Sequence, residues 1–159
     1  MQVDVRVQEP DFDAAAEYAA LRKRLGAGVG AVASFIGLVR ELHPGPAGDA
    51  TVEALHLEHY PGMTERSIEA IIARAAARWP LLDVVVIHRV GRLDPGAQIV
   101  FVQVASAHRG AAFGACELVM DYLKTEAVFW KREDTARGSR WVEATGEDRA
   151  RVSDRRGDA

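Results

Sequence analysis

The chain has 159 residues, 48% of them hydrophobic, and its 20 basic and 23 acidic side chains give a formal net charge of −3. This length suits one compact domain with a sizeable core, and the charge does not favour a general nucleic-acid binder, which is usually basic. No apolar run approaches the ~20 residues of a membrane span, so we expect neither a membrane protein nor a secretory signal. The single cysteine cannot form an internal disulfide or a Cys-based zinc site, which favours a reducing, cytoplasmic location.

The three lysines are a second feature of the composition. Every other basic residue is arginine, whose guanidinium does not lose its proton in proteins, whereas an amine can. Lys124 and Lys131 lie close together in the sequence, and Lys23 is far from both. Composition alone leaves two interpretations open, namely chance placement or lysines kept for proton transfer.

The first part of the chain predicts three strands, one helix and one loop. Residues 11–25 have a helical pattern, with Asp11 as a candidate N-cap and Gly26 at the end. Proline and glycine dominate 43–49, which predicts a loop. Alternating or continuous apolar residues predict strands over 2–8, 30–40 and 51–59.

The rest of the chain predicts two helices, a hairpin and two short strands. Pro80 ends a helical pattern that begins after the Pro-Gly break at 61–62, and a second helical pattern covers 110–124. The Asp-Pro-Gly sequence at 94–96 is typical of a turn and predicts the hairpin. The predicted strands are 84–90 and 99–105, joined by this turn, and the short segments 128–133 and 140–143.

Hairpins interrupted by about three helices predict an α+β fold in a single domain over 1–143, rather than a doubly wound parallel sheet. The remaining segment, 144–159, carries almost no large apolar residue and equal numbers of acidic and basic residues. We expect this segment to be a flexible, charged C-terminal tail.

The segment Ser-Ala-His-Arg-Gly at 106–110 lies where a predicted buried strand gives way to a helix. Backbone N–H groups and the dipole at a helix start favour an anion, and Arg109 adds a planar group suited to phosphate or carboxylate. His108 can donate a hydrogen bond or transfer a proton. The alternative is that His108 caps the turn and that Arg109 pairs with a surface carboxylate.

Lys124 and Lys131 belong to the segment MDYLKTEAVFWKRE at 120–133. Lys124 comes near the end of the predicted helix, and Lys131 follows two aromatic residues that can place an apolar wall beside it. Burial and neighbouring cations make a lysine amine easier to deprotonate, so it can serve as an acid, a base or a nucleophile. Arg132 and Glu133 can hold substrate or orient the amines. The alternative is a solvated helix end followed by a charged edge strand.

Arg40 follows Leu38 and Val39 at the end of an apolar strand, just before the loop rich in proline and glycine. An arginine in this place can clamp an anion, although an ordinary surface arginine is the more common outcome. The histidines show no metal-ligand spacing with neighbouring acids, so no metal site is predicted. Cys116 lies on the apolar stripe of its helix and is interpreted as a core residue.

Four segments of the chain form a specific set: FIGLVR at 35–40, LEHYPGMTE at 57–65, IHRVGRLDPG through VASAHRGAAF at 87–113, and MDYLKTEAVFWKRE at 120–133 followed by RWVEA at 140–144. In this order and at these spacings, they resemble the large, catalytic subunit of molybdopterin synthase. The resemblance covers about 30–143, whereas the first helix and the charged tail are not diagnostic. Leu38 is a departure, because many relatives carry a polar or basic residue there.

The resemblance implies a sulfurtransferase of molybdenum-cofactor synthesis, which converts cyclic pyranopterin monophosphate to molybdopterin by adding two sulfurs as a dithiolene. The sulfur comes from a small ubiquitin-like subunit with a C-terminal Gly-Gly thiocarboxylate, so this chain is expected to need no cofactor and no catalytic cysteine. Family members form a heterotetramer around a central dimer of large subunits, with an α/β-hammerhead fold. Neither a nucleic acid nor a membrane is an expected partner.

The resemblance also implies roles for the residues that match the family's motifs. The essential lysine pair falls on Lys124 and Lys131, the first as principal acid and base and the second as its partner in substrate binding. A backbone contact at Leu38 could survive the change of side chain. The implied substrate-binding set is Leu38, Val39, Arg40, His108, Arg109, Lys124, Lys131, Arg132 and Glu133.

Two other functions fit the same residues. A lysine-dependent lyase would form a Schiff base with a carbonyl substrate, which borohydride would trap. A non-catalytic scaffold would bind a ubiquitin-like partner even without both lysines, and it would convert no pterin.

Overall fold

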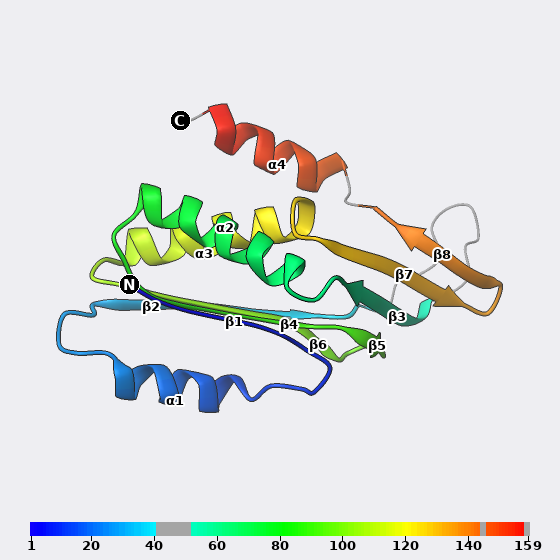
Figure 1. Cartoon of the computed structure of the whole chain (residues 1–159), viewed down its shortest axis with the longest axis horizontal. Coiled ribbons are helices and arrows are strands. Elements are labelled where there is room, and N and C mark those ends of the chain that lie inside the picture. The colour runs from blue at the N-terminus through cyan, green and yellow to red at the C-terminus, as the bar shows by residue number, and fades with distance from the viewer. Residues whose placement is uncertain (41–51, 144–145, 158–159) are drawn as a thin grey trace.

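The computed structural model describes residues 1–40, 52–143 and 146–157, and within these ranges it has eight strands and four helices. The strands form two four-stranded sheets, and the second sheet extends from one end of the first (Figure 1). The predicted α+β class is confirmed. The loop predicted over 43–49 lies outside the described residues.

The first sheet has the strand order β1-β4-β6-β2. Its strands are β1 (Gln2–Gln8), β4 (Leu81–Arg89), β6 (Gln98–Ser106) and β2 (Ala31–Leu38). β4 and β6 are antiparallel, which confirms the predicted hairpin, while β1 pairs with β4 in parallel. The two central strands are almost fully buried because helices cover both faces of the sheet (Figure 1). β2 is an edge strand and stays partly exposed.

Helices α2 (Met63–Arg78) and α3 (Arg109–Thr125) cover one face of the first sheet, and α1 (Ala14–Arg24) covers the other (Figure 1). The apolar stripe predicted for α2 is buried and packs with the valines of β4 and β6 and the apolar side of α3. α2 ends just before Pro80, as predicted. No helix in the described ranges is both long and apolar enough to cross a membrane.

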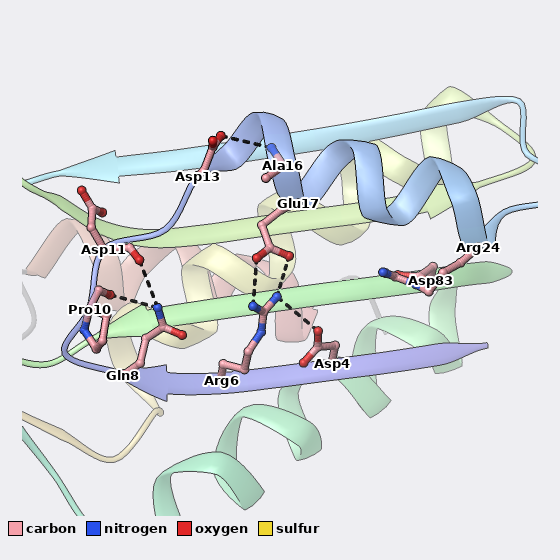
Figure 2. A network of polar contacts seen from close by, with 10 residues as sticks. All are labelled: Asp4, Arg6, Gln8, Pro10, Asp11, Asp13, Ala16, Glu17, Arg24 and Asp83. Atoms are coloured by element: carbon pink, nitrogen blue, oxygen red, sulfur yellow. Dashed lines mark hydrogen bonds and ion pairs between the residues drawn. The ribbon is translucent and has the colours of Figure 1, made fainter.

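Charged side chains hold α1 on the sheet beneath it (Figure 2). Arg6 of β1 donates hydrogen bonds of 2.8 and 2.6 Å to the two carboxylate oxygens of Glu17. Arg24, at the other end of α1, donates a 3.1 Å hydrogen bond to the buried carboxylate of Asp83 on β4. Because both ends of the helix are tied, α1 keeps a fixed direction across the strands.

The N-cap of α1 is Asp13, and not Asp11 as the sequence predicted. The Asp13 carboxylate accepts hydrogen bonds from the N–H groups of Ala15 and Ala16. Asp11 instead accepts a 2.9 Å hydrogen bond from the side chain of Gln98, at the start of β6. Either aspartate is a suitable cap by residue type, so the local pattern does not distinguish them.

The second sheet has the order β5-β3-β7-β8 and is antiparallel throughout. Its strands are β5 (Gly91–Leu93), β3 (Val52–His59), β7 (Phe129–Thr135) and β8 (Gly138–Val142). The predicted hairpin of β4 and β6 therefore contains an extra short strand, β5, which joins the other sheet. The last two predicted strands pair as a hairpin of their own.

A buried histidine joins the two sheets. The imidazole of His88 on β4 stacks on the ring of Phe129 on β7, with centroids 4.0 Å apart, and its Nδ1 lies 2.9 Å from the carbonyl oxygen of Arg89. Burial lowers the His88 pKa from 6.5 to about 4; the hydrogen bond to Arg89 opposes this shift, and the charge of Lys131 adds to it. The ring is therefore neutral near pH 7, with its proton on Nδ1, because a carbonyl oxygen can only accept.

Helix α4 (Gly146–Gly157) lies in the segment expected to be a flexible, charged tail, and it makes four helices in the described ranges where about three were predicted. α4 packs on α3 (Figure 1), and its Val152 is only 6% exposed, within the main core cluster. Burial of one valine contributes about 1.5–3 kcal/mol. The composition of the segment conceals this helix because its main anchor is a single apolar side chain.

Gly30 lies so close to the backbone ahead of α3 that a larger residue should destabilise the protein. Its N–H donates a 3.1 Å hydrogen bond to the carbonyl oxygen of Ser106, and an added Cβ would collide with the carbonyl oxygen of Ala107. Gly30→Ala should lower the free energy of unfolding by about 1–3 kcal/mol in urea denaturation. Gly26→Ala is the matched control, because its Cβ would meet nothing within 4 Å. Equal stabilities of the two variants would contradict this packing.

The buried His88 should make the protein less stable in acid. Its pKa in the folded chain is about 4, below its ordinary 6.5, so the unfolded chain binds the proton more readily. The neutral His88 therefore contributes its full share to the free energy of unfolding above pH 6.5. This share, about 3 kcal/mol, is lost as the pH falls from 6.5 to about 4. His88→Gln should flatten the fall in the free energy of unfolding over this pH range, whereas His108→Gln, at an exposed position, should not. Parallel slopes for the wild type and His88→Gln would show that the prediction is wrong.

Candidate active site

Helix α3 carries chemistry-bearing side chains at both of its ends. His108 and Arg109 stand at its start, and Lys124 lies in its last turn. At about 1.5 Å per residue, the helix from Arg109 to Lys124 is roughly 22 Å long. The structure therefore divides the predicted site residues other than Arg132 into two groups and does not bring them all together within one chain.

The first group lies where α3 ends and the two sheets meet. Val39 is buried with Leu57 of β3, and Phe129 of β7 packs against the same cluster. The N–H of Val39 donates to the carbonyl oxygen of Ala97 at 2.9 Å, and its own oxygen accepts from Gly96 at 2.7 Å. These contacts hold the end of β2 near β7, which follows directly on α3. The predicted site residues on or next to these elements are Leu38, Val39, Arg40, Lys124, Lys131 and Glu133, and of these Lys124 lines the pocket described next.

A pocket of about 290 Å³ opens between α3 and the edge strand β2. Lys124, which is exposed, lines this pocket, and Phe35 and Met120 give it apolar surface. The carboxylates of Glu117 and Asp121 also line it, so the lysine shares the pocket with acidic groups. A cavity that combines apolar walls with a few charged groups is typical of a small-molecule site.

Cys116 lines the same pocket, and the structure confirms its interpretation as a core residue. Burial, and to a lesser extent the charge of Glu117, raise the pKa of its thiol to about 11. The sulfur is therefore protonated at neutral pH and is a poor nucleophile. In the part of the chain that the structure describes, no three His, Cys, Asp or Glu side chains are grouped to hold a metal ion.

The two faces of β7 separate its charged residues. Lys131 and Glu133 share a face with Phe129, because alternate residues of a strand point to the same side. Glu133 is 3% exposed and accepts a 2.9 Å hydrogen bond from Arg140 on β8. Lys131 is half-buried on this face, near enough for its charge to lower the pKa of His88.

Arg132 lies on the opposite face of β7 from Lys131. It forms a 3.2 Å ion pair with Asp134, and its guanidinium lies over the ring of Trp141. Arg132 belongs to the substrate-binding set implied by the resemblance, but strand alternation turns its side chain away from Lys131.

The second group is the His-Arg pair at the start of α3. Ser106 secures the preceding turn, since its hydroxyl donates to the carbonyl oxygen of Pro80 at 2.8 Å and accepts from the N–H of His108 at 3.4 Å. His108 is the N-cap residue, but its side chain makes no capping hydrogen bond. Arg109 is exposed and has no ion-pair partner among the residues that the structure describes. The His108 side chain therefore does not cap the turn, and Arg109 forms no surface ion pair in the described part of the chain.

Three apolar side chains of the pocket did not stand out in the sequence as site residues: Phe35, Phe113 and Met120. Phe113 falls on the helical stripe that predicts core, yet it is 67% exposed. Phe35 lies on a strand whose pattern predicts burial, yet it is 40% exposed because β2 is at the sheet edge. Strand order depends on distant pairings, so a single-sequence pattern carries no direct signal for it.

The sequence profile of the family described as MoaE protein matches residues 7–126. The molybdopterin synthase catalytic subunit of Ralstonia nicotianae is 56% identical over 152 residues, which cover 96% of this chain and 80% of that protein. The profile match covers the whole of α3 and ends just before β7.

Solved structures show the same similarity. The molybdopterin biosynthesis MoaE protein from Burkholderia ambifaria superposes with a TM-score of 0.79 at 52% identity, covering 96% of this chain and 97% of that one. A chain in the complex of subunits 1 and 2 of molybdopterin-converting factor from Helicobacter pylori shares the fold, with a TM-score of 0.68, 17% identity and coverage of 89% and 90%. From the extent of the sequence match and these identities, we conclude that the chain belongs to the MoaE family.

Proposed function

We propose that the chain is the catalytic subunit of a molybdopterin synthase. It transfers sulfur from the C-terminal thiocarboxylate of a small ubiquitin-like subunit to cyclic pyranopterin monophosphate and so forms the dithiolene of molybdopterin. Membership of the MoaE family and 56% identity to a catalytic subunit of this enzyme support the proposal. The main structural support is the pocket beside Lys124, in the last turn of α3.

Both reactants are anions, the pterin through its phosphate and the partner through its thiocarboxylate. A chain of net charge −3 binds anions only where its positive field is local. Arg40, Lys124 and Lys131 supply such a field near the joint of the sheets. His108 and Arg109 supply another at the start of α3, where the helix dipole and the first N–H groups add to it.

The chemistry requires protons at defined atoms. The thiocarboxylate sulfur attacks a pterin side-chain carbon, the acyl link to the partner is hydrolysed, and the displaced oxygen leaves as it takes up a proton. We assign Lys124 as the principal acid and base for these steps and Lys131 as its partner in holding the substrate. The reactive sulfur arrives on the other subunit, so this chain needs no bound cofactor, and the inert thiol of Cys116 takes no part.

The two cationic groups can serve one substrate if two copies of the chain combine. The roughly 22 Å of helix between Arg109 and Lys124 exceeds the length of a pterin monophosphate. The edge strand β2 offers a contact surface, since Phe35, Ile36 and Leu38 expose 40%, 42% and 55% of their surface. An exposed edge with apolar side chains pairs readily with a second strand.

The direction of α3 in such a dimer brings the two cationic groups together. β2 and α3 begin at the same end of the molecule, because Gly30 bonds to Ser106 just ahead of the helix. Two copies that pair antiparallel through β2 about a two-fold axis therefore also have antiparallel α3 helices. The start of α3 in one copy then approaches Lys124 of the other, and the dimer contains two composite sites.

A small subunit at each composite site completes a heterotetramer. The Helicobacter pylori complex supports such a partner, since one of its chains shares this fold. The Gly-Gly tail of the partner is narrow enough to enter the pocket between β2 and α3. We place the assembly in the cytoplasm, where reducing conditions suit a protein with one free thiol.

Lys124→Ala should abolish dithiolene formation and leave the fold intact, because this side chain is exposed and its amine supplies the proton. The assay incubates the full chain with a thiocarboxylated Gly-Gly partner and cyclic pyranopterin monophosphate and measures the dithiolene product. Loss of a general acid and base lowers a rate by about 10²- to 10⁴-fold.

Lys23→Ala is the matched control, since it removes an exposed amine from α1, on the other side of the first sheet. It should turn over like the wild type. Near-normal activity of Lys124→Ala would contradict the role of that lysine. A wild type that forms no product, or that borohydride traps on a carbonyl substrate, would contradict the proposed function itself.

A further inference from the structure

Helix α4 brings an arginine to the pocket that contains Lys124. Arg151 lines this pocket together with residues of α3 and β2. The neighbouring Val152 is buried in the core and fixes α4 on α3. The position of Arg151 is therefore set by a packed backbone and not only by a long side chain at the surface.

Arg151 adds a positive charge to a pocket that also contains acidic residues. α3 contributes two carboxylates, Glu117 and Asp121, and one amine, Lys124. Beside these two acidic residues, a further cation favours the entry of an anionic reactant. Among the residues that the structure describes, Arg151 is the second cation of the lining, and it brings the formal charge of the pocket to zero.

The guanidinium of Arg151 is weakly engaged with its own helix. Its ion pair with Glu147 is 3.5 Å long, and the two side chains are 54% and 80% exposed. Exposed pairs of this kind contribute little to stability, so an incoming anion can replace Glu147 as the partner. A guanidinium also presents two parallel N–H donors, which match the oxygens of a phosphate or a carboxylate.

We propose that Arg151 is an anion-binding residue of this pocket and contacts either the phosphate of the pterin or the carboxylate-like end of the partner's tail. The inference rests on the proposed function and extends it, because it makes α4 a part of the substrate site. Lys124 supplies the proton, and Arg151 supplies the charge that holds the anion beside it.

Two separate binding measurements on the full chain distinguish the sources of the anion. One is the Kd of cyclic pyranopterin monophosphate in the absence of the partner. The other is the Kd of a partner that ends in an ordinary Gly-Gly carboxylate, in the absence of the pterin. Arg151→Ala should weaken one of these by about tenfold, the order expected for a lost charge-assisted hydrogen bond. Arg151→Lys should recover part of the loss.

Arg149→Ala is the matched control on the same helix. Arg149 pairs with Glu143 at 3.0 Å, is 62% exposed, and does not line the pocket. It should leave both Kd values unchanged. The proposal is overturned if Arg151→Ala binds both ligands like the wild type or more tightly, or if Arg149→Ala weakens binding equally. A wild type that binds neither ligand would instead contradict the proposed function.

Discussion

Helix α3 holds the two cationic groups of this protein roughly 22 Å apart, and this rigid spacing constrains every account of the site. Its start is fixed by Ser106 and by the close approach of Gly30, and its end leads directly into β7. A helix of this length, buried along one side, does not bend to bring Arg109 to Lys124. In the proposed two-fold pairing of β2 edges, the two α3 helices are antiparallel. The start of each helix then lies near Lys124 of the other copy, which forms two equivalent sites.

The joint between the two sheets positions the other half of each site. His88 and Phe129 stack across it, and Lys131 follows Phe129 on the same face of β7. Val39 is buried at the same joint, and this burial places the next residue, Arg40, close to it. α4 adds its own contribution from the far end of the chain, since the burial of Val152 brings Arg151 to the pocket.

Local patterns predict most of the strands and helices here, because period-2 and period-3.6 apolar repeats report directly on burial. They fail where distant contacts decide. Asp13 caps α1 while Asp11 bonds to Gln98, and α4 forms although Val152 is its only buried apolar anchor in the described part of that helix. The lysine pair could be singled out from composition and motif, but the opposite direction of Arg132 follows from strand alternation. The separation of Arg109 from Lys124 follows from the continuous helix predicted over 110–124.

Mixed dimers of two inactive variants measure most directly whether the site is shared. One chain carries both His108→Ala and Arg109→Ala, and the other carries Lys124→Ala. If each site takes residues from both copies, every mixed dimer keeps one intact site, and an equimolar co-assembled mixture should recover about a quarter of the wild-type rate of dithiolene formation. If the residues of one chain serve one site, no dimer has an intact site, and a mixture that stays inactive would contradict the account.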